Sequence, residues 1–223
     1  MLQEESKWIC TELLKLNKKN KVSPLLNFGS STGHFRKKLQ SFIHKNIFEP
    51  LEMAGVTVFH LDIKESDGVD FVGNVFENRE LFNKIREKKI NSILCSNLLE
   101  HVPDPVPFYK ILEELIQDNG YILVTVPFRY PYHADPIDTK YRPTVEEIVM
   151  NFSNAKLVKG EILTIDQTHF KYMLQHPRLF FILLIRVFTP FYRFQSWKKI
   201  MADFLNFFKK FMVTCVLVQV EKK

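Results

Sequence analysis

Short apolar runs alternate with longer amphipathic stretches along the first half of the chain. The apolar runs are rich in β-branched and aromatic residues and are bounded by Gly, Pro, Asn or Asp, so they predict buried strands. These predicted strands are Val22–Phe28, Val56–Asp62, Val69–Gly73, Ile90–Ser96 and Tyr121–Val126. The stretches between them predict helices over His34–Ile47, Arg79–Lys88 and Pro105–Gln117. Strands that alternate with helices predict a parallel sheet covered by helices on both faces.

Capping residues mark where some of these helices begin. Asp104 followed by Pro105 predicts an N-cap and a first helical residue. Thr144 predicts the cap of a further helix over Thr144–Asn151, with Glu147 as its capping-box partner.

Two later apolar runs, Leu157–Ile165 and Met212–Val220, predict the closing strands. The fold class is therefore α/β: a seven-stranded, mostly parallel sheet with helices on both faces and a helical insertion before the last strand. We divide the chain into an N-terminal helix (1–21), a core (22–170), an insertion (171–211) and a final strand (212–223).

Amino-acid composition further limits the class of protein to which the chain can belong. The 223 residues are 46% hydrophobic and 25% charged, which suits one elaborated globular domain and excludes disordered and collagen-like chains. The three cysteines are far apart with no CxxC pair, which excludes a disulfide scaffold and favours a reducing compartment. Residues 1–21 lack the apolar core of a signal peptide, so we expect a cytoplasmic protein.

The net charge of +6 is concentrated near the C-terminus. Residues 171–211 carry eight Lys or Arg and one acidic residue, together with 12 of the 30 aromatic side chains. Their apolar run, Leu179–Ile185, is too short to span a bilayer. Beyond Pro190, apolar residues recur at helical spacing: Phe194, Trp197, Met201, Phe204, Leu205, Phe208 and Phe211.

A basic, aromatic amphipathic helix has three explanations. It can lie on an anionic membrane surface, which would make the protein peripheral to a membrane. It can instead pack on the sheet or form a homodimer. Nucleic acid is the weakest alternative, because no base-stacking module accompanies the basic residues.

Ligands of open parallel sheets bind beyond the carboxyl ends of the strands. The first strand ends in the small residues Gly29, Ser30, Ser31 and Gly33, which allow a tight turn into a helix N-terminus. Gly33 is followed by His34 rather than by the lysine of a phosphate-binding P-loop, which argues against nucleoside triphosphate binding. Asp62 ends the second strand, where a carboxylate accepts bonds from ribose hydroxyls, so loop and acid together favour an adenosine-containing cofactor. A plain tight turn and a solvated acid remain the alternative.

These residues resemble the class I S-adenosylmethionine-dependent methyltransferases of the type 11 kind, which have a Rossmann-like fold. The family's first loop reads acid-x-Gly-x-Gly-x-Gly, and this chain has Asn27-x-Gly29-x-Ser31-x-Gly33. The acid has become Asn and the middle Gly has become Ser. The string Leu99-Glu100-His101 after the fourth strand resembles the family segment that lines the methionine end of the cofactor.

The resemblance implies S-adenosylmethionine as cofactor, with Asp62 at the ribose and Asn74 at the adenine amino group. The implied cofactor-binding residues are Asn27, Gly29, Ser30, Ser31, Gly33, Asp62, Ile63, Asn74, Val75, Ser96, Asn97 and Leu98.

The segment after the fifth strand resembles a loop of methyltransferases that act in surface-glycan biosynthesis. It contains His133, Asp135, Asp138 and Arg142. We expect His133 to be the general base for an acceptor hydroxyl, with either Asp orienting it and Arg142 fixing the loop or an anionic acceptor. His101 is a second candidate base. A network that merely orders the loop is the structural alternative, and the His-x-Asp-x-x-Asp spacing does not match zinc, so we expect no metal.

The predicted function is S-adenosylmethionine-dependent methylation of an oxygen on a sugar or lipid-linked glycan. Motifs of amino-group nucleic-acid methyltransferases are missing, which argues against a nucleic-acid acceptor. Two alternatives stay open: methylation of another small molecule, and a non-catalytic binding or scaffold module, which the Asn27 and Ser31 departures favour.

Overall fold

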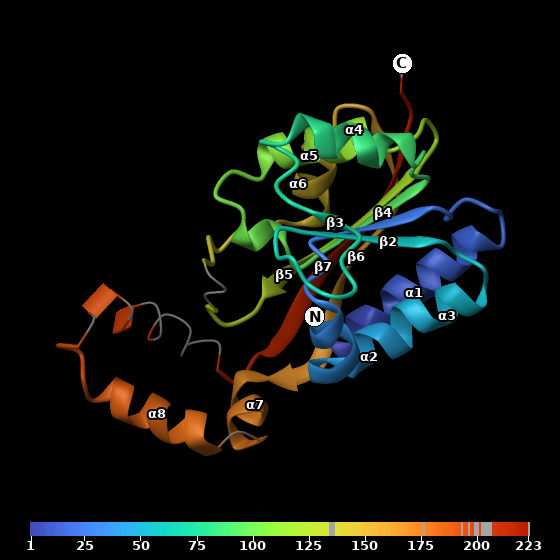
Figure 1. Cartoon of the computed structure of the whole chain (residues 1–223). Helices are drawn as coiled ribbons and strands as arrows, with labels where there is room; N and C mark the ends of the chain where they lie inside the picture. Colours follow the sequence, from blue (N-terminus) through green and yellow to red (C-terminus); the bar gives the residue numbers. More distant parts are fainter. Residues whose placement is uncertain are drawn as a thin grey trace.

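A seven-stranded sheet forms the centre of the computed structural model, which describes residues 1–133, 137–175, 177–192, 194–195, 197–198, 201 and 207–222. The strand order is β3-β2-β1-β4-β5-β7-β6 (Figure 1). The strands are β1 (Leu25–Phe28), β2 (Val58–Asp62), β3 (Phe71–Val72), β4 (Ser92–Ser96), β5 (Tyr121–Arg129), β6 (Ala155–Thr168) and β7 (Lys210–Val220). The predicted fold class is confirmed.

Strands β1 to β5 are parallel to one another, and β7 pairs antiparallel with both β5 and β6. The strand order reverses at β1, whose Leu25 is in register with Val58 on one side and Ser92 on the other. Such a reversal leaves a crevice at the carboxyl ends of β1 and β4, where the chain departs to opposite faces.

The two faces of the sheet bury separate cores. In Figure 1, α1 (Gln3–Asn17), α2 (Ser41–Ile43) and α3 (Glu49–Met53) cover one face, and α4 (Arg79–Glu87), α5 (Val106–Leu115) and α6 (Val145–Met150) cover the other. Neighbouring strand residues alternate between the cores because successive side chains point to opposite faces. Leu25 packs with the α1 side and Leu26 with the α4 side.

The helix predicted over His34–Ile47 is interrupted. It forms π-helical turns at Phe35–Leu39 and His44–Phe48, with Gln40 leaving helical geometry at φ −121° and ψ 62°. Pro50 follows in the first turn of α3. Because proline has no N–H to donate to the preceding turn, a regular α-helical ladder cannot continue through it. The plain α-helix that we predicted is therefore wrong in detail.

Capping was predicted correctly for α6 and not for α5. Thr144 and Glu147 form the reciprocal capping box. In α5 the N-cap is Pro105 rather than Asp104, whose Oδ1 accepts from the Val106 N–H at 3.1 Å. Pro105 takes the cap position because a short Asx turn at Asp104 precedes the helix.

The insertion projects from the lower end of the sheet as α7 (His169–Gln175) and α8 (Pro177–Val187) (Figure 1). No helix among the described residues is long and apolar enough to cross a bilayer. The predicted apolar stripe stops earlier than expected, since Phe208 lies in a turn and Phe211 belongs to β7. Antiparallel pairing of β7 with β6 begins at Lys210, which takes Phe211 into the core. Phe204 and Leu205 lie outside the described residues.

Candidate active site

A cavity of about 360 Å³ opens at the carboxyl ends of β1, β2, β4 and β5. Its floor comes from the loops after these strands, and one wall comes from the N-terminal residues. The lining residues are Met1, Leu2, Asn27, Gly29, Ser30, Ser31, Phe35, Arg36, Gln40, Ile43, Phe48, Asp62, Lys64, Ser96, Asn97, Leu98, His101, Pro127, Tyr130, His133 and Val213.

The loop after β1 keeps the backbone shape that a Gly-rich sequence would adopt. Gly29 has φ 71°, and a Cβ there would lie 2.8 Å from Leu98 Cδ2. Ser31 has φ 55°, so this serine occupies the left-handed region at a cost of about 1 kcal/mol. A Cβ on Gly33 would lie 2.6 Å from the Asp67 carbonyl oxygen. Ser31 therefore adopts a positive φ that a glycine would adopt without this cost.

Asp62 is tied to this loop and still faces the cavity. Its Oδ2 accepts from the Ser31 N–H at 2.7 Å, and its Oδ1 accepts from the Lys64 N–H at 3.0 Å. A carboxylate has about four acceptor positions. About two acceptor positions of the Asp62 carboxylate therefore remain for a ligand.

Arg36 holds the loop from beneath. Its guanidinium is 2% exposed and donates to the carbonyl oxygens of Ser30, Ser31 and Gly68. A planar fork with five donors is suited to bridging several carbonyls at once. No motif in the sequence points to Arg36. The one available signal is that Arg36 shares a predicted helix face with the buried Ile43 and Ile47.

Asn27, in place of the family's acid, is oriented by His60. The Asn27 Nδ2 group donates to His60 Nδ1 at 3.1 Å, which leaves the Asn27 oxygen as an acceptor on the cavity side. Burial lowers the pKa of His60 to about 3, and the positive charges of Arg36 and Lys37 add to the effect. The ring is therefore neutral near pH 7 and accepts the amide hydrogen.

We expect this histidine to make the fold acid-sensitive. A pKa that falls from 6.5 to about 3 on folding means that the unfolded chain binds the proton more readily. Stability is then complete above pH 6.5 and falls as the pH drops below it, by up to about 1.4 kcal/mol per pH unit. Urea unfolding at about pH 8 and about pH 5 measures the difference. His60→Asn, which keeps an acceptor, should flatten it, and the exposed His34→Asn should not. Equal pH dependence in all three proteins would contradict this assignment.

Glu5 anchors the N-terminal helix over the cavity. Its side chain is fully buried, and Oε1 accepts from Asn97 Nδ2 and from the Thr125 hydroxyl, both at 2.6 Å. Its Oε2 accepts from the Leu2 N–H at 2.9 Å. Glu5 does not line the cavity itself, but it holds Leu2 and Asn97, which do. No local sequence signal identifies Glu5, because its partners are 92 and 120 positions away.

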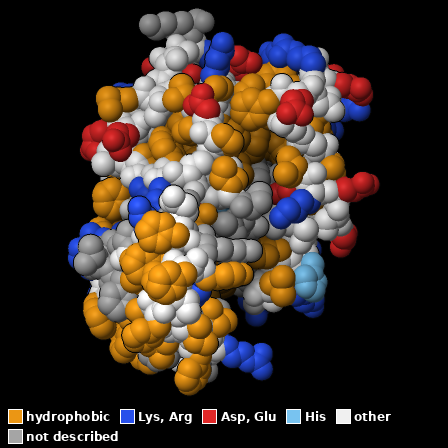
Figure 2. Space-filling view, turned by 90° about the vertical axis from the view of Figure 1, so that its left-hand side faces the viewer, with side chains coloured by type: hydrophobic (Ala, Val, Ile, Leu, Met, Phe, Trp, Pro, Cys, Tyr) orange, Lys and Arg blue, Asp and Glu red, His pale blue; other side chains and the backbone are white. Residues whose placement is uncertain are grey.

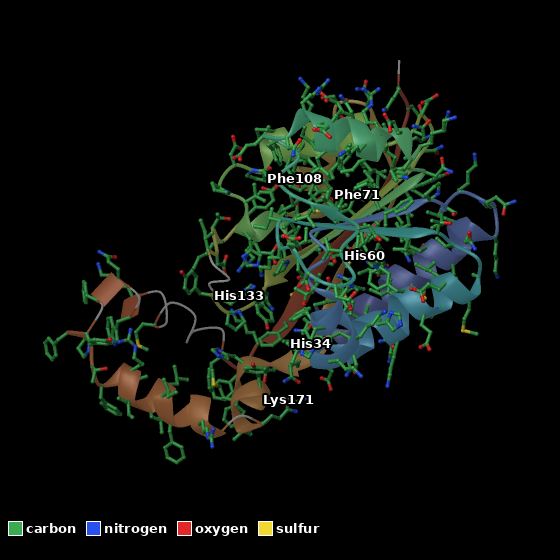
Figure 3. All side chains as sticks on the ribbon, in the orientation of Figure 1. His34, His60, Phe71, Phe108, His133 and Lys171 are labelled. Carbon is green, nitrogen blue, oxygen red and sulfur yellow. The ribbon has the colours of Figure 1, made fainter. Side chains whose placement is uncertain are left out.

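Two histidines and a glutamate meet where β4 and β5 end. The ligand atoms of Glu100, His101 and His133 all lie within 4.8 Å of one another. The rings of His101 and His133 are 5.2 Å apart in an edge-to-face arrangement. Figure 3 shows His133 beside the end of β5. Burial lowers the pKa of His133, and the neighbouring His101 and Arg142 oppose protonation further.

Asp138 orders the loop that carries His133. It is buried and accepts from the His133 N–H at 3.1 Å, the Lys140 N–H at 2.8 Å and Arg142 at 2.8 Å. Burial alone would raise the pKa of Asp138, but these hydrogen bonds lower it. His133 Nδ1 is 3.5 Å from Asp138 Oδ2. Asp138 therefore orders the loop through these hydrogen bonds and also lies close to the His133 ring.

A second cavity of about 180 Å³ shares one lining residue, Tyr130, with the first. Its lining is Phe128, Arg129, Tyr130, Pro131, Lys140, Arg142, His169, Lys209 and Phe211. It contains four Lys or Arg residues and, among the described residues, no Asp or Glu. This composition favours a negatively charged occupant.

Most of the predicted site residues converge on the first cavity, and some do not. Gly33 packs against the backbone of Asp67 and Gly68 and does not line the cavity. Ile63 is 71% exposed and does not line the cavity either. Asn74 turns its Oδ1 to the Phe76 N–H at 3.0 Å, and Val75 is buried in the core. Arg142 lines the second cavity. Asp135 lies outside the described residues.

Comparison with known proteins agrees with this architecture. No curated protein matches the sequence. Among solved structures, the 4+2-cyclase SpnF aligns with a TM-score of 0.56 at 10% identity, covering 97% of this chain and 81% of that one. Coclaurine N-methyltransferase, bound to N-methylheliamine and SAH, aligns with a TM-score of 0.51 at 12% identity, covering 95% and 70%. At these identities the likeness shows the fold.

A family model provides the assignment. The model described as "Methyltransferase domain" matches residues 2–173, which include every strand that lines the first cavity except β7. The chain therefore belongs to the methyltransferase domain family and is an enzyme whose cofactor is S-adenosylmethionine.

Proposed function

We propose that this protein methylates an oxygen of a negatively charged acceptor, such as a sugar or lipid-linked glycan that carries phosphate or carboxylate groups. The observation that carries the proposal is that Tyr130 lines both the first cavity and the second, cationic one. The first cavity suits the cofactor, and the second, cationic cavity suits the acceptor. The acceptor oxygen would reach the methyl group beside Tyr130.

The residues of the first cavity fit the cofactor. Asp62 keeps acceptor positions for ribose hydroxyls, and Asn27 keeps an amide oxygen for an ammonium group. Ser96, Asn97 and Leu98 line the same cavity beside the glycine loop. When bound, S-adenosylmethionine supplies an electrophilic methyl group on a sulfonium. The remaining task of the protein is to orient the two reactants and exclude water.

Cations surround the proposed acceptor on several sides. Arg129 comes from β5, Lys140 and Arg142 come from the loop after it, and Lys209 comes from the end of the insertion. Arg142 is held in place by Asp138 at 2.8 Å. Several fixed cations around one cavity can bind a phosphate or carboxylate through charge-assisted hydrogen bonds.

We assign His133 the role of accepting the hydroxyl proton. Asp138 positions it through the backbone contact at 3.1 Å and the ring contact at 3.5 Å. Its ring lines the first cavity next to Tyr130, at 5.1 Å between ring centroids. His101 stands beside it as the second candidate. Asp135 keeps its place in the proposal as a further orienting residue.

Methyl transfer to matched anionic and neutral sugars tests the proposal. We expect the anionic acceptors to be preferred, and Arg129→Ala to raise their KM about tenfold or more through the loss of one charged hydrogen bond. His133→Ala should lower kcat by about 100-fold while calorimetry shows unchanged affinity for S-adenosylhomocysteine.

Lys38→Ala, at an exposed position, is the matched control and should alter neither constant. A preference for neutral acceptors, or an unchanged KM in Arg129→Ala, would refute an anionic acceptor. Unchanged turnover in His133→Ala would remove this histidine from the mechanism.

We also propose that the insertion lies on an anionic membrane surface, which brings the enzyme to a lipid-linked acceptor. Figure 2 shows hydrophobic side chains gathered on the lower part of the molecule, where the insertion lies. Phe181 is 64% exposed, Phe188 is 80% exposed and Phe191 is 95% exposed. Arg186 lies between Phe181 and Phe188 in the sequence, and Arg178 and Lys198 flank the three phenylalanines. Exposed aromatics with interspersed cations suit the interface of a charged bilayer.

Sedimentation with phosphatidylglycerol-containing vesicles measures this association. We expect the double variant Phe188→Ser/Phe191→Ser to reduce vesicle binding by at least about tenfold, since each phenyl ring contributes about 1.5–3 kcal/mol when buried. Leu39→Ser, at a position 69% exposed on the core, is the control and should bind as the wild type does. Equal sedimentation of all three proteins would exclude this surface. Dimerisation through it would instead appear as a change of mass in solution.

A further inference from the structure

Glu100 is buried without a hydrogen-bonding partner. Its side chain has no exposed surface, and neither carboxylate oxygen accepts a hydrogen bond from any described residue. His101 Nε2 lies 3.8 Å from Glu100 Oε1, which is too far for a hydrogen bond. Burial raises the pKa of Glu100 to about 7, against the opposing attraction of Arg142. A buried, unpaired carboxyl group costs several kcal/mol and calls for a compensating partner.

The Nδ1 atom of each neighbouring imidazole faces an oxygen, which leaves Nε2 as the nitrogen available for a ligand. His101 Nδ1 is bonded to the Ile137 carbonyl oxygen, so Nδ1 carries the hydrogen and Nε2 keeps its lone pair. His133 Nδ1 lies 3.3 Å from the Pro131 carbonyl oxygen and 3.5 Å from Asp138 Oδ2. This arrangement, with Nδ1 donating to an oxygen, is the one that orients metal-binding histidines in proteins.

The backbone around the cluster is also fixed. The Thr139 N–H and hydroxyl both bond to the Glu100 carbonyl oxygen, at 2.9 Å and 3.0 Å. This double contact joins the loop after β5 to the turn that carries Glu100 and His101. The three side chains are thus held together by elements that are 33 positions apart in the sequence.

We propose that Glu100, His101 and His133 bind a divalent transition-metal cation. Two imidazole nitrogens and one carboxylate form a ligand set that suits Mn²⁺, Fe²⁺, Co²⁺ or Zn²⁺ and leaves positions open for other ligands. The ligand atoms lie within 4.8 Å of one another. Bonds of about 2.0–2.2 Å require the three ligand atoms to lie closer together than they do in the cation-free protein. The spacing of residues along the loop after β5 predicts no metal site. That spacing does not include Glu100, which comes from the end of β4.

The cation would lie at the wall of the first cavity, which both histidines line. Its open positions would then hold oxygens of the acceptor, and this role rests on the proposed function. Cation binding itself does not depend on the proposed function, because it requires neither cofactor nor acceptor. His133 accepts the hydroxyl proton only in the cation-free enzyme, because its lone pair is a metal ligand when the cation is bound.

Titration of the untagged, metal-free protein with CoCl₂ tests the site. We expect one equivalent of Co²⁺ to bind and to produce the visible absorption of a four- or five-coordinate ion. Zn²⁺ should displace it. Glu100→Gln and His133→Gln should each weaken binding by at least about 100-fold, since lost supporting contacts alone cost 10–100-fold. The control is His34→Asn, whose side chain is exposed and lies outside the cluster (Figure 3). It should bind as the wild type does.

Folding of the variants is measured in the same samples. Glu100→Gln removes a buried carboxyl group, so its metal-free melting temperature should equal or exceed that of the wild type. Absence of a stoichiometric Co²⁺ complex, or equal affinity in folded Glu100→Gln, would overturn the site. Co²⁺ binding without any methyl transfer to sugars would leave the site standing and refute the proposed function. Methyl transfer that survives chelation, in a protein that binds no Co²⁺, would refute the metal site and leave the proposed function standing.

Discussion

Replacing Arg36 with methionine will lower the free energy of unfolding by about 3–5 kcal/mol, the largest effect that we expect from any single substitution in the chain. The guanidinium donates to three carbonyl oxygens of two loops, and it is buried. Methionine fills a similar volume and donates nothing, so these oxygens lose their charged partner. Burial converts each loss into a desolvation cost.

The same substitution will weaken cofactor binding. Ser30 and Ser31, whose carbonyls Arg36 holds, line the first cavity, and Ser31 keeps its left-handed backbone only while its surroundings enforce it. Urea unfolding and calorimetry with S-adenosylhomocysteine measure the two effects. Lys37→Met changes an exposed neighbour and should leave both unchanged. Arg36→Lys should recover only part of the stability, because an ammonium lacks the planar fork. A fully stable Arg36→Met protein would show that the loop is held by other contacts.

Replacing Glu5 with alanine will cost about 2–4 kcal/mol of stability. Three donors lose their acceptor: Asn97, the Thr125 hydroxyl and the Leu2 N–H. Thr125 is fully buried, so its hydroxyl has no water to replace the carboxylate. Glu5→Gln keeps one acceptor oxygen and should lie between alanine and the wild type.

This substitution also tests whether the N-terminal helix helps to form the cofactor site. Leu2 and Asn97 line the first cavity, so their release should weaken S-adenosylhomocysteine binding by about tenfold, the equivalent of about 1.4 kcal/mol. Calorimetry measures this value, and thermal unfolding measures stability. Glu4→Ala, an exposed neighbour in the same helical turn, is the control. Unchanged affinity in a folded Glu5→Ala protein would limit the role of Glu5 to folding.

Residues with purely local patterns were predicted well. The apolar runs that formed the strands and the capping box at Thr144 depend on neighbours within a few positions, and both appear as expected. Local rules failed where another element intervened. Pro50 changed the geometry of the helix before it, and pairing with β6 drew Phe211 into a strand.

The sequence determined the sheet, the small-residue loop and the position of Asp62, because strand periodicity and turn chemistry are properties of adjacent residues. Only the tertiary structure decided which charges meet in the site. Glu5 joins Thr125 across 120 positions, and Glu100 meets His133 across 33. It also decided that Arg129, Arg142 and Lys209 surround one cavity. Such contacts arise from the path of the chain around the sheet, and they leave no spacing pattern by which a sequence alone could reveal them.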